Sequence, residues 1–390
     1  MNTQWIRKLN PEVRMPEPHQ DLPLHAVVIT DLHYLSPELF SLESASFQRM
    51  LATNDAKLIE GMPDLLAEFK EAMIRTRPEA VLFAGDLTMN GEMISLLEVR
   101  QALAEIQEAG VPVLVIPGNH DIAYPYAVNV KQDTPYRAQM ISQKEFTELM
   151  AVFGYAQAVS RAPDSFSYAY ALRKNLWIVT ADTNTEAKPG AVTETTLAWL
   201  EEVLRTAQEQ GIHVITMTHH NLLKQNRLFY KGFLTANAEE VVKVLMKYGV
   251  KLNLSGHSHL QHICEEHGFI DICTESAAVW PVGWNELTVN DSQVMLERIE
   301  SSCCDQEQAK ERINDWIAAQ LRKELSSLLQ DPKLVEQLTD FGVELGREYY
   351  TGRLKEVRSF AGSEAWANWV ALKGNSFWRI YLSEIFREFL

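Results

Sequence analysis

The sequence has few cysteines, no excess of basic residues and no long hydrophobic run. A formal net charge of −16 argues against a general nucleic-acid-binding surface, because such a surface needs Lys and Arg to neutralise phosphates. No apolar stretch reaches the roughly 18 residues that cross a bilayer. We therefore expect neither nucleic acid nor a membrane as a partner.

The four cysteines are expected to be reduced thiols, since none has the Cys-x-x-Cys spacing of a zinc or redox site. Cys303 and Cys304 are adjacent, which is unfavourable for pairing with each other. Cys264 and Cys273 could lie on neighbouring strands, although reduced core thiols are the favoured interpretation. Because the N-terminal residues also lack the apolar segment of a secretory signal, we expect a cytoplasmic protein.

Patterns of buried strands alternate with helical patterns over most of the chain. Runs rich in β-branched residues predict the strands, and apolar residues at helical spacing predict the helices between them. The predicted strands are 24–30, 79–84, 111–116, 165–172, 175–181, 212–218 and 251–254, with further strands to about 299. The predicted helices are 54–75, 92–109, 143–153, 193–210 and 238–248. This alternation indicates a layered α/β sheet structure.

The character of the chain changes at residue 301, where Glu and Gln increase and the apolar period becomes helical. A chain of 390 residues also exceeds the usual size of one domain. We expect a large α/β domain over residues 1–300 and a helical C-terminal domain or cap over residues 301–390. The tryptophans of the helical part are expected in its core, and this part could also mediate oligomer formation.

Five predicted strands end in a short polar cluster, at the sheet edge where α/β proteins bind ligands. Six of the eleven histidines lie in these clusters, which random placement would not produce. Each cluster alone is more simply explained by turn, cap or structural residues, but together they predict a metal centre. The clusters are Asp31/His33, Asp86, Asn119/His120, His219/His220 and His257/His259.

The residue types of the clusters narrow the choice of metal. Imidazoles, carboxylates and an amide oxygen without thiolates suit Mn, Fe, Zn or Ni better than Mg²⁺ or Ca²⁺. The ligands are too many for one tetrahedral ion, so two ions with a bridging carboxylate are expected. An acidic protein that handles phosphate esters needs a local cationic centre, and metal ions supply one.

The order D-x-H, GD, GNHD, H and GHSH resembles the calcineurin-like metallophosphoesterase superfamily over about residues 24–300. The segments Asp182-Thr183-Asn184 and Gly190 to Leu200 are similar to two further motifs of that superfamily. The resemblance implies a four-layer α/β/β/α sandwich. The compact GNHD and GHSH blocks look most like those of class III cyclic-nucleotide phosphodiesterases.

The resemblance also implies which residues hold the metal ions. Asp86 would bridge the two ions. The first ion would take Asp31, His33 and His259. The second ion would take Asn119, His219 and His257.

The same resemblance makes His120 the group that contacts the phosphate and protonates the leaving oxygen, with Asp121 orienting its ring. The physical chemistry agrees with this role. A hydroxide that bridges two cations has a lowered pKa and can attack phosphorus in line, and the cations offset charge on the equatorial oxygens. An imidazolium near neutral pH is a competent acid for the departing alkoxide.

The His219-His220 pair departs from many relatives, because Asn221 follows it where they carry proline. Which histidine is the ligand therefore stays open, with His219 favoured because it lies nearer the strand. His220 and Asn221 are then candidates for contact with the substrate.

The motifs predict phosphoester chemistry but contain nothing that recognises a base or a ribose. We expect a dinuclear metal-dependent hydrolase of phosphodiesters with cyclic nucleotides as candidate substrates, and a phosphomonoesterase or nucleotide phosphatase as the alternative. A non-catalytic metal-binding scaffold is disfavoured because every expected ligand position is filled, and a DNA nuclease because the chain is acidic. Specificity would come from the loops 122–162 and 221–235 and from the helical domain.

Overall fold

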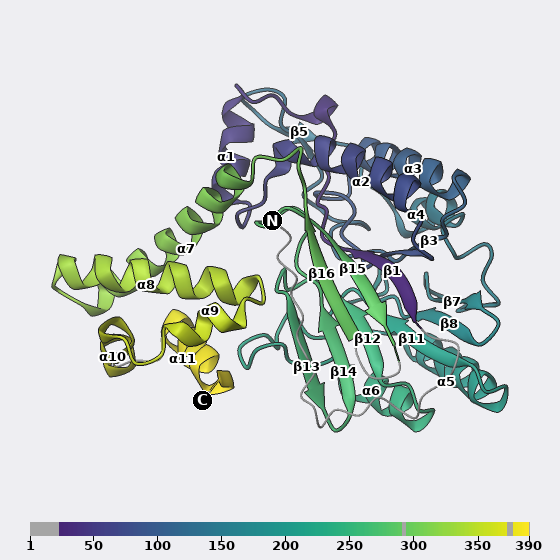
Figure 1. Ribbon diagram of the computed structural model, residues 1–390. Coiled ribbons are helices and arrows are strands. Elements are labelled where there is room, and N and C mark those ends of the chain that lie inside the picture. The colour runs from purple at the N-terminus through teal and green to yellow at the C-terminus, as the bar shows by residue number, and fades with distance from the viewer. Residues whose placement is uncertain (1–22, 291–293, 373–376, 390) are drawn as a thin grey trace.

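The computed structural model describes residues 23–290, 294–372 and 377–389, and these form two facing β-sheets with helices on the outer faces (Figure 1). The N-terminal segment behind the expectation of a cytoplasmic location lies outside the described residues, so that location stays a prediction. Among the residues described, no helix is both long and apolar enough to cross a membrane.

The first sheet has five strands in the order β16-β15-β1-β2-β3. The strands β1, β2 and β3 are parallel, and β15 lies antiparallel to β1. Helices α2 (Met62–Thr76) and α3 (Met93–Glu108) pack on this sheet. The strand bounds are β1 (Leu24–Ile29), β2 (Val81–Phe83), β3 (Val113–Val115), β15 (Gly283–Val289) and β16 (Val294–Glu300).

The second sheet has seven strands in the order β13-β14-β12-β11-β8-β7-β6. Its central strands β14, β12, β11 and β8 are parallel, and a separate apolar cluster joins its outer face to α5 (Glu194–Glu209) and α6 (Ala238–Lys247). The strand bounds are β6 (Ser160–Arg161), β7 (Tyr168–Arg173), β8 (Leu176–Thr180), β11 (His213–Met217), β12 (Leu252–Ser255), β13 (His262–Glu266) and β14 (Phe269–Cys273). The α/β/β/α layering is therefore confirmed.

Several short helices and strands lie in the connections between the long elements. They are α1 (Ala45–Thr53), α4 (Gln143–Met150), the 3₁₀ helices η1 (Pro37–Leu39) and η2 (Ile59–Gly61), and the two-residue strands β4 (Val128–Asn129), β5 (Tyr136–Arg137), β9 (Asn184–Thr185) and β10 (Lys188–Pro189). The single helix predicted over 54–75 is wrong in its first part. Asp55 and Ala56 both have positive φ, so the chain turns there before α2 begins.

The chain after β16 forms helices that stand to one side of the sandwich (Figure 1). They are α7 (Gln306–Leu328), α8 (Pro332–Tyr350), α9 (Leu354–Ser359), α10 (Glu364–Ala371) and α11 (Phe377–Phe389). Their apolar side chains belong to the same continuous cluster as the side chains that fill the space between the two sheets. Trp369 and Trp378 are buried in it, as expected for core tryptophans. A helical C-terminal region is therefore confirmed.

All four cysteines are free thiols, as expected. Cys264 and Cys273 do lie on the neighbouring strands β13 and β14, but they are not opposite each other. Cys273 pairs in register with His262, whereas Cys264 pairs with Asp271. The register thus separates the two sulfurs along the strands, and Cys264 is only half-buried.

Candidate metal centre

The polar clusters meet where the carboxyl ends of β1, β2 and β3 face those of β11 and β12. These ends come from both sheets, so the clusters gather in the crevice between the two sheets. Parallel strands bring their carboxyl ends to one edge, which is the physical reason that residues distant in sequence become neighbours here.

The first group consists of Asp31, His33 and His259. The Nε2 atoms of His33 and His259 lie 3.1 Å apart. Oδ1 of Asp31 lies 3.3 Å from Nε2 of His259 and 3.8 Å from Nε2 of His33. Three potential ligand atoms from two sheets therefore converge on one point.

The second group consists of Asp86, His219, His257 and Asn119. Nε2 of His219 lies 3.4 Å from Oδ2 of Asp86 and 3.0 Å from Oδ1 of Asn119. The ligand atoms of Asp86, His219 and His257 all lie within 4.8 Å of one another.

Asp86 lies between the two groups. Its Oδ2 is 3.7 Å from Nε2 of His33 in the first group and 3.4 Å from Nε2 of His219 in the second. Its Oδ1 accepts a hydrogen bond of 2.8 Å from the backbone N–H of His120, which fixes the carboxylate. One carboxylate thus faces both groups, as a bridging ligand must.

Backbone carbonyls orient two of the histidine rings. Nδ1 of His219 lies 2.8 Å from the carbonyl oxygen of Ala84, and Nε2 of His257 lies 2.6 Å from that of Gly232. A carbonyl only accepts, so each of these nitrogens carries its proton. In the neutral ring the opposite nitrogen then carries the lone pair, which is the form that binds a metal ion.

The backbone of the centre is held in uncommon conformations. Left-handed conformations cost about 1–3 kcal/mol each for residues other than glycine and concentrate at functional sites. Five of the clustered residues have φ between 47° and 67°, namely Asp31, His33, Asp86, His257 and His259.

The glycines of the motifs allow close approach of the chain. A Cβ atom on Gly118 would lie 2.0 Å from Oδ1 of Asp86, and one on Gly256 would lie 2.6 Å from Oδ2 of Asp31. Only glycine therefore fits at these two positions.

A buried carboxylate oxygen indicates that the residues fit a metal ion. Oδ1 of Asp31, which faces the ring nitrogens of His33 and His259, is buried without a hydrogen-bond partner among the described residues. Such unsatisfied atoms are rare because desolvation without a partner is costly. A cation beside Oδ1 of Asp31 would satisfy that carboxylate, and the mixed carboxylate, imidazole and amide ligands suit a transition metal.

The charge states of the acidic and histidine side chains in the centre also favour the binding of cations. Burial raises the pKa of Asp86, but His219 and His120 outweigh it and hold that pKa well below its usual range. Burial and the Lys57 ammonium keep the pKa of His33 well below its ordinary value, and burial lowers that of His257 to about 4. Burial also lowers the pKa of His219, but Asp86 outweighs it and raises the value to about 9. A metal ion would displace that proton.

His120 lies at the edge of both groups. Its ring centroid is 4.9 Å from that of His33, and it stacks on Tyr124 at 4.4 Å. Its Nδ1 lies 2.8 Å from the carbonyl oxygen of Met89 and 3.2 Å from Oδ1 of Asn90. With its proton on Nδ1 directed at the carbonyl, the ring leaves Nε2 for an incoming substrate.

The family model of calcineurin-like phosphoesterases matches residues 24–261, which is more than half of the chain and spans every polar cluster described above. The chain belongs to the calcineurin-like phosphoesterase family. It is accordingly a metal-dependent phosphoester hydrolase of a family with a dinuclear metal centre, and the two groups are candidate metal-ligand clusters.

Individual relatives of this phosphoesterase are distant. The chain is 23% identical over 252 residues to a 3′,5′-cyclic-nucleotide phosphodiesterase of Nostoc sp., which covers 64% of this chain and 76% of that one. It is 24% identical over 226 residues to a probable cyclic nucleotide phosphodiesterase of Ruthia magnifica, covering 56% of this chain and 81% of that one. A solved dimetal phosphatase of Danio rerio shares the fold, with a TM-score of 0.50 and 16% identity over 71% of this chain and 99% of that one.

The expected orientation of His120 by Asp121 is wrong for this phosphoesterase, because Met89 and Asn90 face the ring nitrogen instead. Oδ2 of Asp121 accepts hydrogen bonds from the backbone N–H groups of Leu87 and Gly118. Its Oδ1 accepts two more from Thr88. Asp121 therefore ties the loop after β2 to the loop after β3 and acts on His120 only through the backbone.

The structure also corrects the substrate contacts expected of His220 and Asn221. His220 is 5% exposed, its Nδ1 lies 2.8 Å from Oγ1 of Thr183, and it is His219 that faces Asp86. Asn221 is 1% exposed, and its amide binds Ser255, Gly256 and Ser258. Asn221 thus holds the loop of the GHSH motif in place instead of facing a substrate.

Sequence reasoning missed Lys57, Met89, Asn90 and Tyr124, which surround His120 and the first group. None of them belongs to a motif, and Met89 acts through its backbone carbonyl. The one available signal is the run Asn54 to Lys57 at the start of the predicted helix 54–75, with three polar residues out of four.

Proposed function

We propose that this phosphoesterase hydrolyses phosphodiesters, with 3′,5′-cyclic nucleotides as candidate substrates. The observation that carries the proposal is the position of Asp86 between two ligand groups with His120 at their edge. The names of the two distant relatives support cyclic nucleotides within this class.

The residues of the centre divide into two sets of metal ligands. The carboxylate of Asp86 would serve both ions. Asp31, His33 and His259 would hold the first ion, and Asn119, His219 and His257 would hold the second. The imidazole-rich set favours Mn, Fe, Zn or Ni. When bound, the ions supply Lewis-acid activation of the nucleophile and of the phosphoryl group.

The protein's own residues perform the remaining chemistry. His120, protonated at both nitrogens, donates its Nε2 proton to the leaving oxygen, while its Nδ1 keeps a proton that is hydrogen-bonded to the Met89 carbonyl. Asp121 holds the loops that carry these groups, and Asn221 holds the loop that carries His257 and His259.

The division of the chain follows from these roles. We assign residues 1–300 to the catalytic domain and residues 301–390 to a helical domain, whose described helices pack against loops around the centre. Arg312 of α7 binds the carbonyl oxygen of Lys57 at 2.9 Å, and Tyr381 of α11 stacks on Phe229 at 5.9 Å. The helical domain thus acts on the shape of the substrate site.

The test is a parallel assay of the Mn²⁺-loaded protein against bis(p-nitrophenyl) phosphate, 3′,5′-cyclic AMP and p-nitrophenyl phosphate. We expect metal-dependent turnover of the diesters that exceeds that of the monoester. Turnover of the monoester alone would make the protein a phosphatase and overturn the proposal. Full activity in Asp86→Ala would overturn the mechanism.

A further inference from the structure

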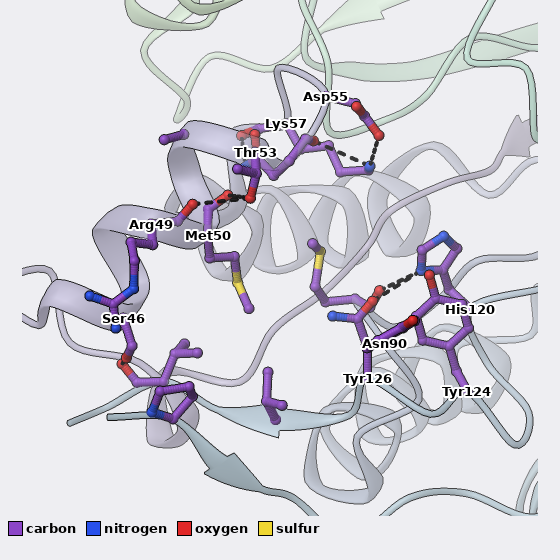
Figure 2. A pocket seen from close by; sticks show the side chains of 16 residues that line it. Ser46, Arg49, Met50, Thr53, Asp55, Lys57, Asn90, His120, Tyr124 and Tyr126 are labelled. Carbon is purple, nitrogen blue, oxygen red and sulfur yellow. Dashed lines mark hydrogen bonds and ion pairs between the residues drawn. The ribbon is translucent and has the colours of Figure 1, made fainter. Parts of the chain in front are cut away.

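A cleft of about 630 Å³ opens beside His120, between α1 and the loops after β2 and β3 (Figure 2). Arg49 and Thr53 of α1 line one side, and Asn90, His120 and Tyr124 line the other. The stacked rings of His120 and Tyr124 give the cleft a flat aromatic wall, with Tyr126 at its rim. A volume of this size takes an organic substituent the size of a nucleoside.

Lys57 lines the same cleft, and its ammonium group has few partners. The residue is 3% exposed. Nζ lies 3.3 Å from the carbonyl oxygen of Asn54 and 3.7 Å from the Asp55 carboxylate, whose side chain is 63% exposed (Figure 2). An ammonium group carries three N–H donors, and a buried charge with such weak pairing is costly. The described residues thus leave this cation able to bind an anion in the cleft.

The chain holds Lys57 in place from several sides. The two residues before it, Asp55 and Ala56, have φ of 54° and 68°, an uncommon conformation that the surrounding structure must impose. Arg312 of α7 donates to the Lys57 carbonyl at 2.9 Å and is itself fixed by two hydrogen bonds to Glu60. The helical domain therefore sets the position of Lys57.

The positive charge of Lys57 interacts electrostatically with residues of the metal centre. Burial outweighs the carboxylates of Asp55, Asp86 and Asp31 and lowers the pKa of Lys57 from its ordinary value, so an anion beside the group would favour its charged form. The Lys57 ammonium lowers the pKa of His33 and of His120, so cations in the centre would repel it unless an anion lies between them. A phosphoryl group is the anion that the centre handles.

We propose that the Lys57 ammonium binds the phosphoryl group of the substrate and that the adjoining cleft holds the leaving alcohol. The inference rests on the proposed function, because His120 borders both the centre and the cleft and protonates the leaving oxygen. The leaving group must then extend from His120 into the cleft. The substrate class is a phosphodiester whose leaving alcohol is planar, aromatic or the size of a nucleoside.

Two variants test the two parts of the inference. Lys57→Met removes the charge, and Ala52→Trp fills the cleft from an exposed position on α1. The matched controls are Lys144→Met on α4 and Ala67→Trp on α2, both exposed and outside the cleft. Bound Mn²⁺ and the melting temperature are measured for every variant, so that loss of metal or fold is separated from loss of substrate contact.

The substrates are bis(p-nitrophenyl) phosphate and methyl p-nitrophenyl phosphate, which share one leaving group and differ in the retained one. We expect Ala52→Trp to lower kcat/KM about tenfold or more for both substrates alike. A loss confined to the bis ester would place the retained group in the cleft and overturn the assignment, as would no loss in either.

A binding measurement keeps the inference apart from the proposed function. Calorimetric titration of the Mn²⁺-loaded protein with inorganic phosphate should show affinity at least about tenfold weaker in Lys57→Met, since a hydrogen bond from a charged group is lost. Ala52→Trp and both controls should bind phosphate like the wild type. Equal affinity in Lys57→Met would overturn the role of Lys57. Absence of diester turnover by the wild type, with this phosphate effect present, would overturn the proposed function and the cleft assignment but leave Lys57 as the anion-binding residue.

Discussion

The end of strand β2 holds the ring of His219 from both sides. Nε2 of His219 lies 3.4 Å from the carboxylate of Asp86, and its Nδ1 lies 2.8 Å from the carbonyl oxygen of Ala84. The residue between them, Gly85, has φ of +97° and leaves room for the ring. A strand of one sheet thus sets the tautomer and position of a histidine that follows a strand of the other.

Gly85→Ala should remove metal binding at the second group. A Cβ atom at this position would lie 2.5 Å from Nδ1 of His219, so the ring must move away from Asp86. We expect a loss of about 1–3 kcal/mol in the free energy of unfolding and fewer than two Mn²⁺ bound per chain. The control is Gly110→Ala, which has φ of +91° but meets nothing within 4 Å. Equal metal content in the two variants would contradict the steric argument.

Asp86→Ala should abolish the dinuclear centre, because this carboxylate faces both ligand groups. Turnover of bis(p-nitrophenyl) phosphate should fall by a factor of about 100 or more. Added Mn²⁺ should raise the melting temperature of the wild type by a few degrees, since it binds only the folded state, and that of Asp86→Ala by less. Asp340→Ala, at an exposed position on α8, serves as the control. An unchanged metal content in Asp86→Ala would refute the bridging role.

His120→Ala should distinguish leaving groups. Cyclic AMP needs protonation of its leaving alkoxide, so its turnover should fall by about 10²–10⁴, whereas p-nitrophenolate departs unaided and should lose far less. Burial lowers the pKa of His120 below 6.5, so in the wild type kcat/KM for cyclic AMP should fall as the pH rises through that lowered pKa. His25→Ala, at an exposed position on β1, should match the wild type. Equal losses on both substrates would exclude the role of general acid.

Glu92→Gln should stabilise the protein above neutral pH. Glu92 is buried, its Oε1 has no partner among the described residues, and burial raises its pKa from 4.5 to about 7. The unfolded carboxyl therefore ionises first, and the wild type loses stability as the pH rises from 4.5 to 7. The amide of Glu92→Gln cannot ionise. We therefore expect its free energy of unfolding to rise relative to that of the wild type by about 3 kcal/mol as the pH increases from 4.5 to 8.

Denaturant unfolding at several pH values measures this difference. The substitution Glu38→Gln, at an exposed position, is the control and should leave the pH dependence unchanged. A constant difference between Glu92→Gln and the wild type from pH 4.5 to pH 8 would show that Glu92 does not titrate as described.

The parts of the fold that follow a repeating pattern were predictable from the sequence. The strands at β1, β3 and β11 and the helix α5 with its Thr193 cap lie where the periodicity places them. The helix predicted over 54–75 was wrong at its start, because apolar residues at helical spacing continue through a turn that depends on positive φ at Asp55 and Ala56. Local periodicity carries no information about such a turn.

The sequence alone determined the family, the residue types of the centre and their order along the chain, because ligand chemistry restricts which side chains can follow each strand. Only the tertiary structure decided what each neighbour does: that His219 and not His220 faces Asp86, that Met89 and not Asp121 orients His120, and that Lys57 lines the cleft. These relationships depend on contacts between segments far apart in the chain. The direction of a side chain is set by the packing of two sheets and a helical domain, and no local pattern records it.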